Sequence, residues 1–77
     1  MDPKEAVLRV LQASDEPLHW TRVQDLALRR GYLDPFERPD VRRDVQRALR
    51  ALARDGAIAR VGKGVYRAGG QLEADDA

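Results

Sequence analysis

The sequence has no cysteine, only one histidine and one tryptophan, and few aromatic residues in total. Without cysteine the chain cannot form disulfides or a thiolate metal site, and one histidine is too few for a zinc site, so we expect no cofactor. Its apolar runs are only a few residues long, so we expect no contact with a membrane interior. The first twenty residues also lack the apolar block of a signal peptide, which makes a cytoplasmic location the default expectation.

The 77 residues are enough for one domain with a thin core. Charge is distributed unevenly along them: residues 41–67 contain eight basic and two acidic residues, whereas residues 68–77 contain three acidic and no basic ones. A basic segment of this kind is typical of a protein that binds a polyanion, although it is also compatible with a solvated helix face. We expect residues 1–68 to be the folded domain and residues 69–77 to be a disordered acidic tail.

Two segments in the first half of the chain have the spacing of a capped helix. Asp2 and Glu5 are placed as a capping box around Pro3, which predicts a helix from Pro3 to Ala13. Thr21 and Gln24 have the same spacing, which predicts a helix from Arg22 to Arg30 that is closed by a left-handed glycine, Gly31. The intervening residues 18–20 are predicted to be a short strand.

A loop from Tyr32 to Asp40 should follow, with Tyr32, Leu33 or Phe36 packed back on the core. Asp40 is a candidate N-cap for a third helix, which Gly56 should end. The buried face of this helix is predicted to consist of Val41, Val45, Ala48, Leu49 and Leu52.

The glycines of Gly62-Lys63-Gly64 separate two short apolar segments and so predict a β-hairpin. A three-residue turn would place Val61 opposite Val65 and Arg60 opposite Tyr66. Ile58 and Tyr66 should then share the inner face of the sheet. The predicted order is helix, strand, helix, helix and hairpin, a mainly α fold with a small antiparallel β-hairpin, which is the order of a winged helix-turn-helix domain.

The third helix carries the strongest functional signal. Arg43, Arg47, Arg50 and Arg54 fall within about 60° of one another on a helical wheel, on the side opposite the apolar residues. A helix in the major groove can use such arginines to contact guanine or phosphate, and a glutamine to contact adenine. The hairpin continues the basic surface as a wing. The candidate DNA-contacting residues are therefore Arg42, Arg43, Gln46, Arg47, Arg50, Arg54, Arg60 and Lys63.

Catalysis has little support in the sequence. His19 lies beside Trp20, but no cysteine, second histidine or paired carboxylate accompanies it, so we expect His19 to be structural and the protein not to be an enzyme. We also expect no small-molecule substrate.

Three segments resemble one known family. Residues 16–23, which include Pro17-Leu18-His19-Trp20, look like the opening of the HARE-type winged helix-turn-helix domain. Gly31-Tyr32-Leu33 is similar to the step after its second helix, and residues 58–66 to its closing hairpin. The family occurs in bacterial restriction and chromatin-linked proteins and in the RNA polymerase delta subunit. The resemblance therefore implies work on DNA, often as a module beside another activity.

We thus expect a module that binds double-stranded DNA and serves in transcription regulation or as part of a DNA-processing protein. Such a module could act as a homodimer or together with a larger protein partner. The alternative is a winged helix that contacts a protein, for example RNA polymerase. In that case Leu28, Tyr32 and Phe36 would matter more than the arginines.

Overall fold

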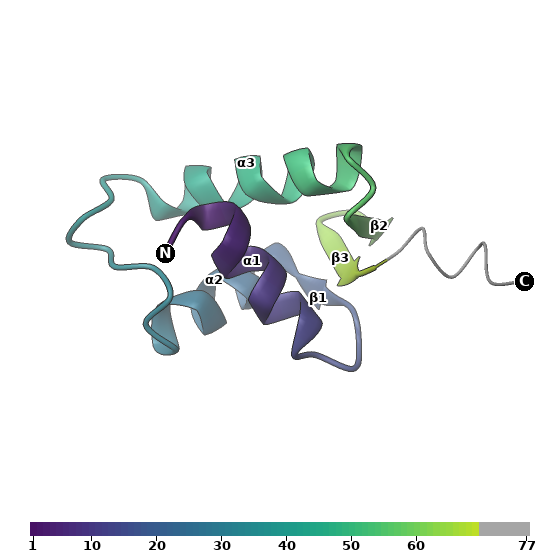
Figure 1. Cartoon of the computed structure of the whole chain (residues 1–77), viewed down its shortest axis with the longest axis horizontal. Helices are drawn as coiled ribbons and strands as arrows, with labels where there is room; N and C mark the ends of the chain where they lie inside the picture. Colours follow the sequence, from purple (N-terminus) through teal and green to yellow (C-terminus); the bar gives the residue numbers. More distant parts are fainter. Residues whose placement is uncertain (70–77) are drawn as a thin grey trace, which may run out of the picture.

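The computed structural model describes residues 1–69, which form three helices and a three-stranded antiparallel sheet. Figure 1 shows α3 running alongside α1 and α2, with the hairpin of β2 and β3 near the C-terminal end of α3. This is the winged helix-turn-helix layout that the sequence predicts. The elements are α1 (Pro3–Gln12), β1 (Leu18–His19), α2 (Trp20–Arg29), α3 (Val41–Arg54), β2 (Ile58–Gly62) and β3 (Val65–Ala68).

Helix α1 begins at its predicted residue but without the predicted capping box. The Asp2 carboxylate accepts hydrogen bonds from the backbone nitrogens of Lys4 and Glu5, at 3.1 and 3.4 Å. The Glu5 side chain does not return to the N-cap and instead pairs with Arg9 one turn later, at 3.3 Å. Only half of the reciprocal motif is therefore formed, and the other acidic group supports the helix through an i, i+4 pair.

Helix α2 begins two residues before the predicted start, and Thr21 is not its N-cap. The cap is His19, whose imidazole Nδ1 accepts a hydrogen bond from the backbone nitrogen of Thr21 at 3.3 Å. The backbone nitrogen of Trp20 donates to the carbonyl of Gly64 at 2.8 Å, so the first helical residue is satisfied by the distant hairpin. Gln24, the expected second member of the box, has a buried Oε1 atom with no hydrogen-bond partner among the residues that the structure describes.

The connection between α2 and α3 follows most of the prediction. Gly31 has a φ of 74°, the left-handed conformation expected after a helix, and Leu33 is buried. Phe36 does not pack back on the core, because its side chain is 97% exposed. Asp40 caps α3 as predicted: its Oδ1 atom accepts a hydrogen bond from the backbone nitrogen of Arg43 at 3.0 Å.

The sheet has the strand order β1-β3-β2. Arg60 lies opposite Tyr66, as predicted, but Val61 is not opposite Val65, because Gly62 takes that place and the register shifts between Arg60 and Gly62. The turn consequently contains only two residues, and the extra residue of β2 forms a bulge that leaves Val61 48% exposed.

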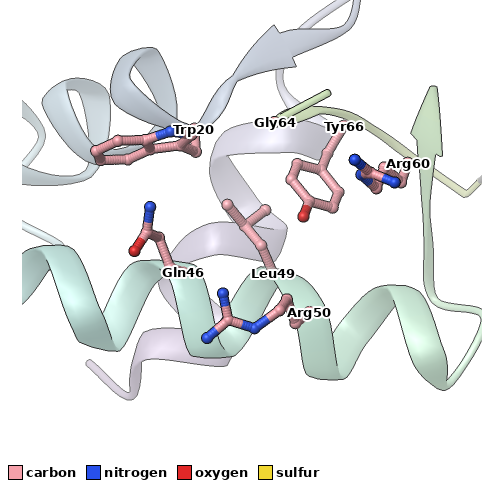
Figure 2. Close-up of a pocket in the computed structure, with 7 residues that line it drawn as sticks. All are labelled: Trp20, Gln46, Leu49, Arg50, Arg60, Gly64 and Tyr66. Atoms are coloured by element: carbon pink, nitrogen blue, oxygen red, sulfur yellow. The ribbon is translucent and has the colours of Figure 1, made fainter. Parts of the chain in front are cut away.

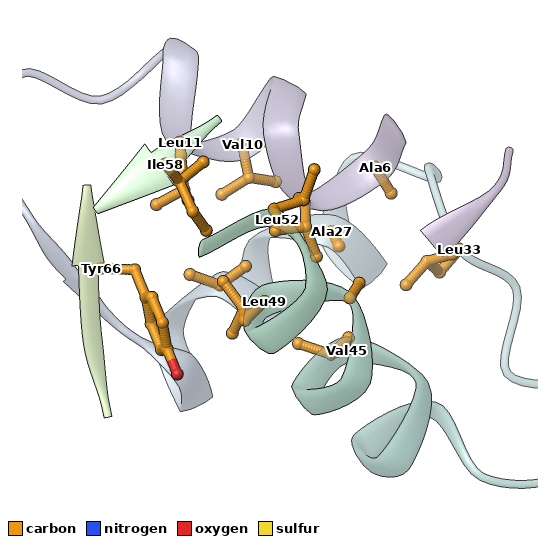
Figure 3. Packing of buried hydrophobic residues seen from close by; sticks show 13 residues of the cluster. Ala6, Val10, Leu11, Ala27, Leu33, Val45, Leu49, Leu52, Ile58 and Tyr66 are labelled. Atoms are coloured by element: carbon orange, nitrogen blue, oxygen red, sulfur yellow. The ribbon is translucent and has the colours of Figure 1, made fainter. Parts of the chain in front are cut away.

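The core lies where the three helices meet the inner face of the hairpin (Figure 3). Helices α1 and α3 each contribute four buried side chains, and Ile58 and Tyr66 come from the sheet, as predicted. The predicted acidic tail falls outside the described residues apart from Gly69, whose backbone nitrogen donates to the carbonyl of Ala57. The buried residues are Ala6, Val7, Val10, Leu11, Val23, Ala27, Leu33, Val45, Ala48, Leu49, Leu52, Ile58 and Tyr66.

Candidate nucleic-acid interface

The outer side of α3 is defined by what its other side buries. Val45, Leu49 and Leu52 face the core, and the helical period therefore turns the arginines outward. Gln46, a predicted contact residue on α3, is half-buried. The five predicted arginines of this helix are all exposed: Arg42, Arg43, Arg47, Arg50 and Arg54. Arg60 on β2 and Lys63 in the turn are exposed as well.

Most of these cations have no carboxylate partner. Within residues 1–69, only Arg43 of the predicted contacts forms an ion pair, with its sequence neighbour Asp44 at 3.8 Å. Asp44 lies closer to Arg38, at 3.3 Å, and its side chain is 18% exposed. The positive charge on the outer side of α3 is thus available to an external anion with almost no intramolecular pairing to break.

Trp20 joins this surface although the sequence analysis did not place it there. The guanidinium carbon of Arg42 lies 5.5 Å from the centre of the Trp20 ring, within the range of a cation–π contact. The contact restricts Arg42 to the side of α3 that faces the start of α2. The sequence shows an aromatic residue at position 20, but it does not show that this residue begins α2 and therefore lies beside α3.

A cavity of about 380 Å³ lies between α3, the start of α2 and the hairpin. It brings together three predicted contact residues from two elements: Gln46 and Arg50 from α3, and Arg60 from β2. Figure 2 shows Leu49 between the two sides of this cavity, with the Trp20 ring above Gln46 and the Tyr66 ring beside Leu49. The complete lining is Trp20, Gln46, Leu49, Arg50, Arg60, Gly64 and Tyr66, with no carboxylate among them.

Arg47 lies on the other flank of α3. It lines a second, more open groove of about 400 Å³ between α3 and the start of α1, together with Asp2, Lys4 and Asp44. The arginines predicted from the helical wheel are all exposed on α3, but the surfaces on the two flanks of this helix differ. One flank faces the aromatic cavity and the wing, and the other faces a groove that contains two carboxylates.

The wing is short and is attached to the rest of the domain. The carbonyl of Gly64 accepts the hydrogen bond from Trp20, and β3 pairs with β1 so that Val65 lies opposite His19. Lys63 stands at the exposed tip of the turn. These contacts hold Lys63 and Arg60 in a fixed relation to the start of α2 and the cavity.

No three side chains of histidine, cysteine, aspartate or glutamate come together within residues 1–69 as a metal site. None of the helices in the same range has both the length and the apolar character needed to cross a membrane. His19, the residue that drew attention in the sequence, holds the start of α2 through Thr21.

The geometry defines a winged helix-turn-helix domain with an exposed basic helix. Comparison with protein-family models, with curated proteins and with solved structures gives no match for this chain. The resemblance to the HARE-type family thus remains a prediction from the residues quoted above.

Proposed function

We propose that this protein binds double-stranded DNA, with α3 in the major groove and the hairpin wing on the phosphate backbone. Such a module would serve in transcription regulation or as part of a DNA-processing protein. The observation that carries the proposal is the run of exposed arginines on α3, of which only Arg43 has a carboxylate partner within residues 1–69, continued by Arg60 and Lys63 on the wing.

The exposed arginines of α3 would gain affinity for DNA by displacing the counterions of its phosphates. DNA affinity at moderate salt comes largely from counterions released as lysine and arginine neutralise phosphates. An arginine already paired with a carboxylate contributes less, because that ion pair must first be broken. Arg42, Arg50 and Arg54 have no such partner within residues 1–69, which supports their assignment to an external polyanion.

Shape supports the same assignment. The major groove is about 12 Å wide and admits one α-helix whose outer side chains can reach base edges. Gln46 and Arg50 are the residue types that pair with adenine and guanine, and both lie on the wing side of α3. We therefore expect the bases to be read from the wing side, with Arg47 closer to one strand of the backbone.

Fluorescence anisotropy with a labelled duplex at several salt concentrations tests the proposal. We expect Arg50→Ala to weaken binding by about 1–3 kcal/mol if Arg50 contacts a base, and Arg47→Ala to reduce the salt slope by about one unit if Arg47 contacts phosphate. Arg30→Ala is the matched control, because this substitution removes the same charge from an exposed position. Arg30 lies at the opposite end of α2 from Trp20. Equal affinity in all three variants and the parent would remove the claim for α3.

A second function is favoured by one observation, the 97% exposure of Phe36. A large apolar side chain at a loop tip is a typical protein contact, and Tyr32 packs beside the core near the start of the same loop. In this reading the domain docks on a partner such as RNA polymerase without reading DNA. Crosslinking from a photoreactive residue at position 36, with purified polymerase as the probe, separates this function from the first.

A further inference from the structure

The cavity beside α3 contains polar groups that nothing in the described chain satisfies. Tyr66 is only 7% exposed, yet its hydroxyl has no hydrogen-bond partner within residues 1–69. The Gln46 amide and the Trp20 indole nitrogen, which border the same cavity, are also without partners in that range. These polar atoms are not sealed from solvent, because Gln24 Oε1 is the one side-chain atom of the described residues that is both buried and without a partner. They are therefore available to a ligand that enters the cavity.

The chemistry of the lining restricts the ligand. Trp20 and Tyr66 contribute aromatic rings and Leu49 an apolar surface, while Arg50 and Arg60 bring two positive charges with no carboxylate between them. Such a site favours a flat, unsaturated group that carries a negative charge. Its volume of about 380 Å³ lies at the lower end of the range of small-ligand sites, roughly 300–1,000 Å³.

We propose that this cavity binds a single unstacked nucleotide. The base would lie against Leu49 near the two aromatic rings, where bases gain affinity by stacking. The Tyr66 hydroxyl and the Gln46 amide would then hydrogen-bond the edge of the base. The phosphate would lie between the guanidinium groups of Arg50 and Arg60.

The proposal rests on the proposed function, because it takes the nucleotide from a DNA strand bound along α3. Gln46 and Arg50 belong both to the outer side of α3 and to the cavity, so a strand in contact with them passes the cavity mouth. Moving a base out of a duplex is least costly where the base is already unpaired. The same chemistry also fits a free nucleoside monophosphate, and the experiment distinguishes the two sources.

The first measurement compares three labelled duplexes of one sequence by fluorescence anisotropy. One is fully paired, one contains a single extrahelical adenosine, and one carries an abasic residue at that extra position. We expect the extrahelical adenosine to tighten binding at least fivefold over both others. The abasic duplex is the control for flexibility, because it bends as easily but offers no base.

The second measurement uses tyrosine variants. Tyr66→Phe keeps the ring in the core and removes only the unpartnered hydroxyl, so the gain from the extrahelical base should fall about threefold to tenfold, as expected for one hydrogen bond. Tyr32→Phe is the matched control, since Tyr32 is the only other tyrosine and does not line the cavity. Thermal unfolding followed by circular dichroism verifies that both variants fold.

Titration with adenosine monophosphate tests whether the cavity binds a free nucleotide. Trp20 is the only tryptophan, so quenching of its fluorescence reports directly on the cavity. Quenching that Tyr66→Phe weakens, without preference among the duplexes, assigns the site to a free nucleotide. Tight binding of all three duplexes without preference or quenching overturns the inference and leaves the proposed function standing. Failure to bind any duplex at low salt rejects the proposed function. In that case, quenching of Trp20 by adenosine monophosphate alone shows whether the cavity binds a nucleotide.

Discussion

Replacing Gly64 with alanine should destabilise the domain more than the same replacement at Gly31. Both glycines have a left-handed backbone, with φ of 71° at Gly64 and 74° at Gly31. Their surroundings differ. A Cβ atom at Gly31 would have no atom within 4 Å, whereas one at Gly64 would lie 3.1 Å from His19 Nε2 and 3.1 Å from Trp20 Cδ1. The pair therefore separates backbone strain from steric contact.

The expected magnitudes follow from these surroundings. An L-residue in the left-handed region costs about 1–2 kcal/mol, of which about 0.4–1 kcal/mol is recovered because alanine restricts the unfolded chain. At Gly31 the net loss should thus be about 1 kcal/mol. At Gly64 the new methyl group also pushes against two rings, and overpacking of this kind costs about 1–3 kcal/mol more. Neither ring can retreat freely, because His19 is bonded to Thr21 and Trp20 lies under Arg42.

Urea unfolding followed by circular dichroism measures both losses. The denaturant slope should be the same in both variants, so that the midpoints report stability directly. We expect the Gly64→Ala midpoint to be the lower of the two, with a difference in the free energy of unfolding of about 1–3 kcal/mol. Equal losses at the two sites would refute the reasoning, since they would mean that the wing turn does not press on the start of α2.

Two further substitutions test separate features of the fold. His19→Ala removes the imidazole that caps α2 and should lower the free energy of unfolding by about 1 kcal/mol, whereas His19→Asn, which retains a capping acceptor, should lose less; urea midpoints that do not differ between the two variants would contradict this role. Phe36→Ser should leave the free energy of unfolding within about 0.5 kcal/mol of the parent, because the side chain is 97% exposed. A clear drop in the urea midpoint would place Phe36 in the core after all.

The helices and their order could be predicted because their signals are local. Asp40 before an apolar period and Gly31 after one each act within a few residues, and both do what the sequence indicates. The start of α2 could not be predicted in this way. Its first backbone nitrogen is satisfied by Gly64, far along the chain, and a histidine took the capping role in place of Thr21.

The turn of the hairpin could not be predicted from local sequence either. Gly62 and Gly64 both permit a left-handed turn residue, so the sequence alone does not choose between a turn of two and of three residues. Only Gly64 adopts positive φ, and the resulting bulge moves Val61 out of register. In the structure Gly62 lies opposite Val65, and the turn contains only the two residues between them.

The sequence predicts the arginines of the candidate site but not the cavity beside them. A helical wheel places the arginines on the outer side of α3, and the structure agrees that they are exposed. The wheel contains no information about what flanks the helix, so it gave no reason to separate Arg47 from Arg50. It also gave no reason to bring in Tyr66, which sequence analysis assigned to the core and which both packs there and borders the cavity.

The division of α3 into a buried side and a charged side has an evolutionary consequence. Within residues 1–69 every buried side chain is apolar or aromatic, and of the exposed arginines on α3 only Arg42 contacts another helix, through Trp20. Descendants of such a gene can exchange one guanidinium for another residue and alter what they bind while the scaffold stays intact. Selection for a new target would therefore act on a handful of codons in one short stretch, with little risk of losing the folded protein.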